Sequence, residues 1–207
     1  MKPLAVVAAL LLPPAALASE LDALAAKVVS AYGGAAAWSK VTEVVARGRV
    51  VPAMRKGDGV MTRTWRGTDN LRVEIAYPEN KSEVRVLENG KGTNNGRESN
   101  AMELAAMRLQ AARLALPKLL ADKRTSLRAA GPNAIEVALD GGLTIELEVD
   151  PATGHIVRST GRSGQMAFAT AYSDFRAVNG LLVPFHEENS AMGMKTADIF
   201  LEKVDIK

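Results

Sequence analysis

Apolar and polar residues alternate with a period of two over many short segments of the chain. In residues 71–77, Leu, Val, Ile and Tyr at the odd positions alternate with Arg, Glu and Ala at the even ones. This alternation predicts a strand with one face on a core and one face in water. Comparable segments bring the expected number of strands to about ten or eleven. They lie near residues 44–50, 61–65, 84–86, 135–139, 143–149, 155–160, 165–175, 182–188 and 195–205.

The half-polar strands favour an antiparallel sheet, because a parallel sheet would need a crossover helix between strands. Asn-Gly pairs at 89–90 and 179–180 predict tight hairpins, since both residues tolerate the positive φ of a type I′ turn. The predicted fold class is mainly β (α+β). A β-sandwich and a single curved sheet around helices both fit the strands. The helical insert described next favours the curved sheet, because a sandwich core has no place for it.

Residues 100–122 are the one long helical pattern after the N-terminal region, and we call them the lid insert. Pro117 predicts a break, with one helix over about 101–115 and a short second one after it. The first helix carries two apolar stripes, although a helix lying on a sheet needs only one. The second stripe therefore needs a partner, which is the N-terminal helix, another protein or an acyl chain. The stripes are Met102, Ala105, Leu109, Ala112 and Leu116, and Leu104, Met107, Ala111 and Leu114.

The N-terminus has the features of a secretory signal peptide. Lys2 precedes a short apolar run, and Ala16-Leu17-Ala18 forms a small-residue cleavage site. We expect residues 1–18 to be removed after Ala18, which leaves one domain over 19–207 in the periplasm. The chain has no cysteine, which excludes a lipid-modified N-terminal cysteine and a disulfide framework. Ser19 to Asp22 reads as a capping box for a short amphipathic helix that ends at Gly33-Gly34.

Charge and candidate chemistry narrow the function further. The 26 Lys and Arg nearly balance the 23 Asp and Glu, which argues against a nucleic-acid partner. His155 follows a turn, and His186 lacks the second histidine of a helical zinc motif. Glu146 and Glu148 fit the wet face of a strand, and Ser163 lies in a loop. We therefore predict no catalytic residues, no metal, no cofactor and no enzymatic activity.

Several segments resemble the LolA/LolB-type lipoprotein carriers and their relatives, the outer-membrane lipoprotein-sorting proteins. The similar segments are residues 66–74 with 77–79 and 88–91, the D-P-A-T-G turn at 150–154, and Y-S-D-F-R-A-V-N-G at 172–180 with its following strand. The resemblance implies an unclosed β-barrel of about eleven antiparallel strands with helices over its concave side. It also implies an apolar cavity that shelters acyl chains.

The expected function is a periplasmic carrier for a lipid, a lipoprotein or another amphiphile, held between the curved sheet and the lid insert. The alternative is a protein-interaction or envelope-assembly module on the same fold. Expected partners are lipid or acylated protein cargo and an envelope protein, with peripheral membrane contact and no transmembrane segment. The candidate ligand-binding residues are Met61, Trp65, Val73, Ile75, Val84, Val86, Met102, Met107, Leu109, Leu114, Met166 and Phe168.

Overall fold

The computed structural model describes residues 14–122 and 125–207, and thirteen strands lie in this part of the chain. Four helices accompany them: α1 (Pro14–Ala31), α2 (Ala35–Trp38), α3 (Ala101–Arg113) and α4 (Leu116–Ala121). A short 3-10 turn, η1, spans Asp140–Gly142. The strands are β1 (Val44–Pro52), β2 (Gly59–Trp65), β3 (Asn70–Ala76), β4 (Ser82–Glu88), β5 (Lys91–Asn94), β6 (Arg97–Glu98), β7 (Leu127–Gly131), β8 (Ala134–Ala138), β9 (Thr144–Val149), β10 (Ile156–Ser163), β11 (Met166–Val178), β12 (Leu181–Ala191) and β13 (Met194–Ile206).

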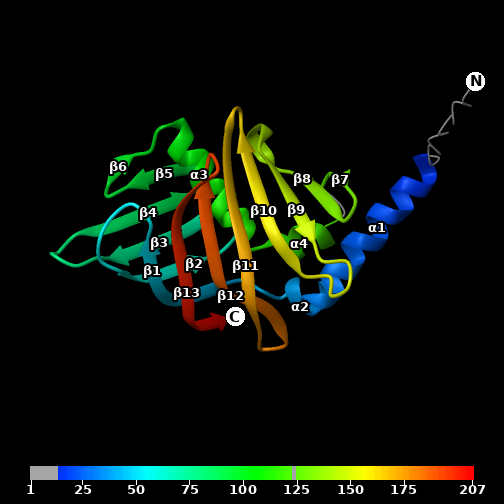
Figure 1. Ribbon diagram of the computed structural model, residues 1–207, viewed down its shortest axis with the longest axis horizontal. Helices are drawn as coiled ribbons and strands as arrows, with labels where there is room; N and C mark the ends of the chain where they lie inside the picture. Colours follow the sequence, from blue (N-terminus) through cyan, green and yellow to red (C-terminus); the bar gives the residue numbers. More distant parts are fainter. Residues whose placement is uncertain (1–13, 123–124) are drawn as a thin grey trace, which may run out of the picture.

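All thirteen strands belong to one antiparallel sheet (Figure 1). Its order is β6-β5-β4-β3-β2-β1-β13-β12-β11-β10-β9-β8-β7, so the first and last strands pair in the middle. The two edge strands, β6 and β7, do not pair with each other, which leaves the sheet open. The prediction of a mainly β, curved, unclosed sheet is confirmed. The strand count exceeds the expected eleven because β5, β6 and β7 are short and carry no alternating apolar pattern.

The helices begin and end close to their sequence signals, with one exception. Pro117 lies in the first turn of α4, so the predicted break in the lid insert is confirmed. Gly33 and Gly34, with φ of 104° and 88°, end α1 as predicted. However, α1 already begins at Pro14 and runs through Ser19, so the predicted cap at Ser19 is wrong for the full chain. Residues 1–13 of the predicted signal peptide lie outside the described residues.

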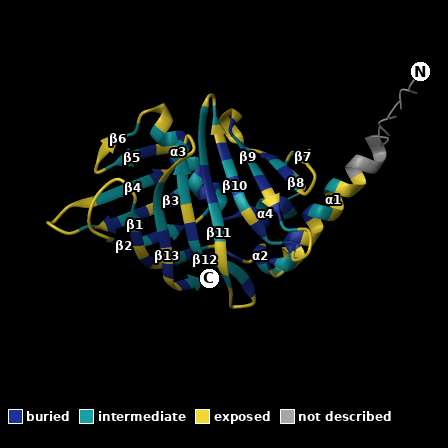
Figure 2. Cartoon of the chain, in the orientation of Figure 1, coloured by how far each residue is buried: buried dark blue, intermediate teal, exposed yellow. Residues whose placement is uncertain are grey.

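Helix α3 packs into the concave side of the sheet through both of its apolar stripes. Leu109 is fully buried against Gly161 of β10, where an added Cβ would come within 2.7 Å of the leucine Cδ2. Met107 is 2% exposed and lies by Gly92 of β5, where an added Cβ would come within 3.2 Å of its sulfur. Two glycines therefore make room for the helix. Met107 of the second stripe therefore finds its partner in the sheet itself. Figure 2 shows the burial of the residues along each element.

A capping box starts α3 and offers a test of the lid insert's local stability. The Asn100 side chain accepts from the Glu103 backbone N–H at 3.0 Å, and Glu103 Oε2 accepts from the Asn100 N–H at 3.0 Å. Asn100→Ala should lower the free energy of unfolding by about 1 kcal/mol, measured by urea titration. Asn100→Asp keeps the cap and serves as the control. Equal losses in the two variants would contradict a capping role.

Candidate functional site

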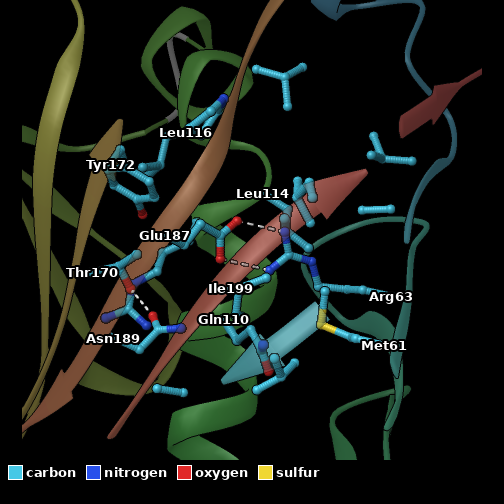
Figure 3. Close-up of a pocket in the computed structure, with 18 of the residues that line it drawn as sticks. Met61, Arg63, Gln110, Leu114, Leu116, Thr170, Tyr172, Glu187, Asn189 and Ile199 are labelled. Carbon is cyan, nitrogen blue, oxygen red and sulfur yellow. Dashed lines mark hydrogen bonds and ion pairs between the residues drawn. The ribbon is translucent and has the colours of Figure 1, made fainter. Parts of the chain in front are cut away.

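A cavity of about 400 Å³ lies between the concave face of the sheet and the helices α3 and α4 (Figure 3). This volume falls within the roughly 300–1,000 Å³ that is typical of small-molecule sites. Apolar side chains from the central strands form much of the wall, and α2 contributes Trp38. Representative members are Val44, Val50, Ile75, Leu182, Ile199 and Leu201. The sheet and the lid insert therefore form the walls of a mainly apolar, partly open space.

A buried ion pair crosses this cavity. Arg63 of β2 donates from Nη1 and Nη2 to Glu187 of β12, at 3.0 and 2.7 Å. The two residues are 3% and 6% exposed, and strands β1 and β13 lie between their own strands. Neighbouring strands are about 4.8 Å apart, so the pair bridges three strand spacings across the concave face. The curvature of the sheet brings these two side chains together.

Burial and the attraction of Glu187 act in opposite directions on the pKa of Arg63. Burial disfavours the charged form of Arg63, but the attraction and hydrogen bonds of Glu187 outweigh it and raise the Arg63 pKa. Arg63 therefore stays ionised. Such a pair contributes little net stability while it is intact, and it becomes costly when one partner is removed.

A second polar group lies beside the pair. Arg113, at the end of α3, donates from Nε to Ser159 Oγ at 3.1 Å and from Nη2 to the Phe168 carbonyl at 2.5 Å. Ser159 Oγ lies 2.7 Å from the Tyr172 hydroxyl, and Tyr172 is directly opposite Glu187 in the β11–β12 ladder. Burial lowers the Arg113 pKa and raises the Tyr172 pKa. Tyr172 therefore stays protonated.

The face of α3 that lines the cavity is partly polar. Ala106, Gln110 and Arg113 are spaced by four and three residues and share one side of the helix. Gln110 Oε1 accepts from Arg85 Nη1 at 3.2 Å. Gln110 and Arg113 belong to neither apolar stripe, and both line the cavity. The apolar stripes lie mostly against the sheet.

The structure distributes the twelve candidate residues over four environments. Met61, Ile75, Leu114 and Phe168 line the cavity. Trp65, Val73, Met107 and Leu109 are buried in the core. Val84 and Val86 pair with Glu74 and Arg72, which places them on the convex face away from the cavity. Met102 is 49% exposed, and Met166 is half-buried next to the turn into β11.

The sequence argument missed all five charged side chains among the described residues that line the cavity: Arg63, Glu83, Arg85, Arg113 and Glu187. Arg63 carried a usable signal, because it shares the strand face of Met61 and Trp65, which are both buried. Glu187 likewise shares a strand face with the buried Phe185. A charged residue in an apolar register indicates a buried partner, since an unpaired buried charge is costly.

Neither histidine belongs to the cavity. His186 lies 2.8 Å from Ser173 Oγ and 3.1 Å from Asp198, and its ring stacks on Phe200. His155 packs on Phe175 with ring centroids 4.5 Å apart. Within residues 14–122 and 125–207, no cluster of three or more His, Asp or Glu could hold a metal ion. No helix in the same ranges is long and apolar enough to cross a membrane.

The architecture and the enclosed site together define a half-barrel with a covered, mainly apolar cavity. Solved structures share the fold of this chain. The chain superposes on a LolA superfamily protein from Nitrosomonas europaea with a TM-score of 0.58, at 10% identity, covering 90% of this chain and 93% of that one. A domain from Vibrio parahaemolyticus that is named for outer membrane lipoprotein sorting gives a TM-score of 0.53 at 8% identity. The superposition covers 92% of this chain and 93% of that domain.

A DUF1329 family protein from Desulfovibrio piger gives a TM-score of 0.53 at 9% identity, and the superposition covers 90% of this chain and 93% of that one. No family model matches the sequence, and no curated protein does. The likeness therefore establishes the fold. The chain has the fold of the LolA superfamily, which confirms the resemblance found in the sequence at the level of architecture.

Proposed function

We propose that the protein is a carrier or binding protein for an amphiphile, whose apolar chain occupies the cavity between the sheet and the lid insert. The observation that carries the proposal is the covered cavity of about 400 Å³ with its mainly apolar lining. Burying a chain there gains about 0.8 kcal/mol per methylene group. The fold shared with lipoprotein-sorting domains supports the same function.

The cavity volume favours cargo with a single chain. A water-sized group occupies about 30 Å³, so the cavity matches on the order of a dozen methylene groups. A cargo with several long acyl chains would need more space or a displaced lid. We therefore favour a single-chain lipid over a multiply acylated lipoprotein. A solid core without a cavity would favour the alternative of a protein-interaction module, and the open volume argues against it.

The proposed site of action is the periplasm. The signal peptide expected over residues 1–18 carries this part of the proposal, with cleavage after Ala18 and one domain over 19–207. Edman sequencing of the exported protein should begin at Ser19. A sequence that begins at Met1 would contradict export with cleavage.

Filling the cavity should abolish binding without unfolding the protein. Ala106 of α3 lines the cavity and is half-buried, so Ala106→Phe places a ring in the space of the ligand. We expect bound lipid to disappear from the variant in native mass spectrometry and the affinity for a single-chain lipid to fall at least about tenfold. The matched control is Ala101→Phe, at an exposed position of the same helix. An occupied cavity in Ala106→Phe would contradict the proposal.

A further inference from the structure

The charged residues that line the cavity do not cancel. Among the described residues, they comprise three arginines, Arg63, Arg85 and Arg113, against two glutamates, Glu83 and Glu187. Arg63 pairs with Glu187 at 2.7 Å, and Arg85 pairs with Glu83 at 3.0 Å. Both carboxylates that line the cavity are therefore already paired with an arginine. In the described part of the chain, no carboxylate lies within ion-pair distance of Arg113, and the cavity keeps one uncompensated positive charge.

The hydrogen bonds of Arg113 are made with neutral acceptors and leave part of its donor set free. Nε and Nη2 bond to Ser159 and to the Phe168 carbonyl. Nη1 bonds to no described protein atom, and it is not one of the enclosed polar atoms that lack a partner. The side chain is half-buried and lines the cavity. Nη1 therefore presents two N–H groups to the cavity space.

A lone charge in such a place is costly, because desolvation disfavours the ionised form. The depressed pKa of Arg113 expresses this cost, which the nearby charge of Glu187 offsets only in part. Arg63, by contrast, meets a carboxylate. Arg113 instead has a free end directed into the space that would hold a ligand.

The neighbourhood suits an anion. A guanidinium group binds a carboxylate or a phosphate through two parallel N–H bonds. Gln110 lies one turn earlier on the same face of α3, and its Oε1 is occupied by Arg85. The Gln110 amide N–H₂ thus remains available as a second donor toward the cavity.

We infer that Arg113 binds the anionic head group of a single-chain amphiphile whose chain lies along the apolar wall of the cavity. The inference rests on the proposed function and adds the chemical class of the cargo. The head group is a carboxylate, as in a fatty acid, or a phosphate monoester. Either one would neutralise the uncompensated charge and use the free donors.

Three ligands with the same chain separate these possibilities: dodecanoate, dodecyl phosphate and dodecanol. Their dissociation constants are measured by isothermal titration calorimetry, with the two anions below their micelle concentrations and dodecanol below its solubility limit. We expect the protein to bind at least one anion about tenfold or more tightly than dodecanol. The preferred anion identifies the head group. Equal affinities for the alcohol and both anions would overturn the inference and leave the proposed function intact.

Arg113→Met tests whether this residue carries the preference. We expect the variant to bind dodecanol about as tightly as the unmodified protein does and to lose its preference for the anion. Arg108→Met is the matched control, because Arg108 is on the same helix, bonds to the Gly90 carbonyl and does not line the cavity. Circular dichroism spectra establish that both variants fold.

An anion preference that persists in Arg113→Met would overturn the assignment to this residue. The same holds for a preference lost equally in Arg108→Met, which would indicate a general effect of net charge. If none of the three ligands binds the unmodified protein, the proposed function fails and the inference fails with it. Arg113→Lys adds a further criterion. It keeps the positive charge but lacks the planar guanidinium group with its parallel N–H donors, so the variant should retain only part of the preference for the anion.

Discussion

Glu187→Leu is expected to lower the free energy of unfolding by about 3–5 kcal/mol, because it leaves Arg63 charged, buried and without its partner. The two side chains are 4% and 8% exposed, so solvent screens the interaction little. Arg63 also has an Nε that already lacks a hydrogen-bond partner. Losing both bonds to Glu187 would leave the whole guanidinium group unsatisfied. Urea titration followed by circular dichroism measures the loss.

The double variant Arg63→Met, Glu187→Leu should recover most of this stability. It removes both charges, and similar-sized apolar groups then fill the space on the concave face. The double-mutant cycle isolates the coupling between the two residues. The control cycle uses Arg47 and Asp205, which pair at 2.8 Å with side chains 48% and 38% exposed. That coupling should be far smaller because water screens it. Additive losses at Arg63 and Glu187 would contradict the argument.

The same pair marks the limit of what the sequence could predict. Period-two alternation predicted strands and their faces well where one face was dry, as in β3 and β9. It also placed Arg63 on an apolar face. Its partner, however, lies 124 residues away, and the meeting depends on the curvature of the sheet. No local pattern in the sequence predicts a contact between residues so far apart along the chain.

Strand β4 shows a second limit. Its residues 83–86 are all half-buried, so neither face is clearly dry. The sequence argument took Val84 and Val86 as candidates, but Glu83 and Arg85 lie opposite Ile75 and Val73 on the cavity side. The register that decides between the two faces comes from the neighbouring strand. A charged cavity wall therefore had the appearance of an ordinary wet face.

The lid insert shows the third limit, and two of its methionines allow a direct test. Sequence analysis treated Met102 and Met107 alike, as candidates for a ligand surface. In the structure Met102 is 49% exposed in the first turn of α3, whereas Met107 is 2% exposed beneath β5. The same substitution at these two sites should therefore have opposite outcomes.

Met107→Asp is expected to unfold the protein. A carboxylate there would be buried without a partner, or protonated at a high cost, and either state loses several kcal/mol. This loss is comparable to the roughly 5–15 kcal/mol that stabilises a typical domain. Met102→Asp should be neutral or slightly stabilising, because an acidic residue in the first turn interacts favourably with the helix dipole. Thermal unfolding by circular dichroism compares the two variants. A Met107→Asp protein that folds with normal stability and loses only its lipid would mean that the second stripe of α3 contacts cargo, and the cavity would then extend beneath the helix.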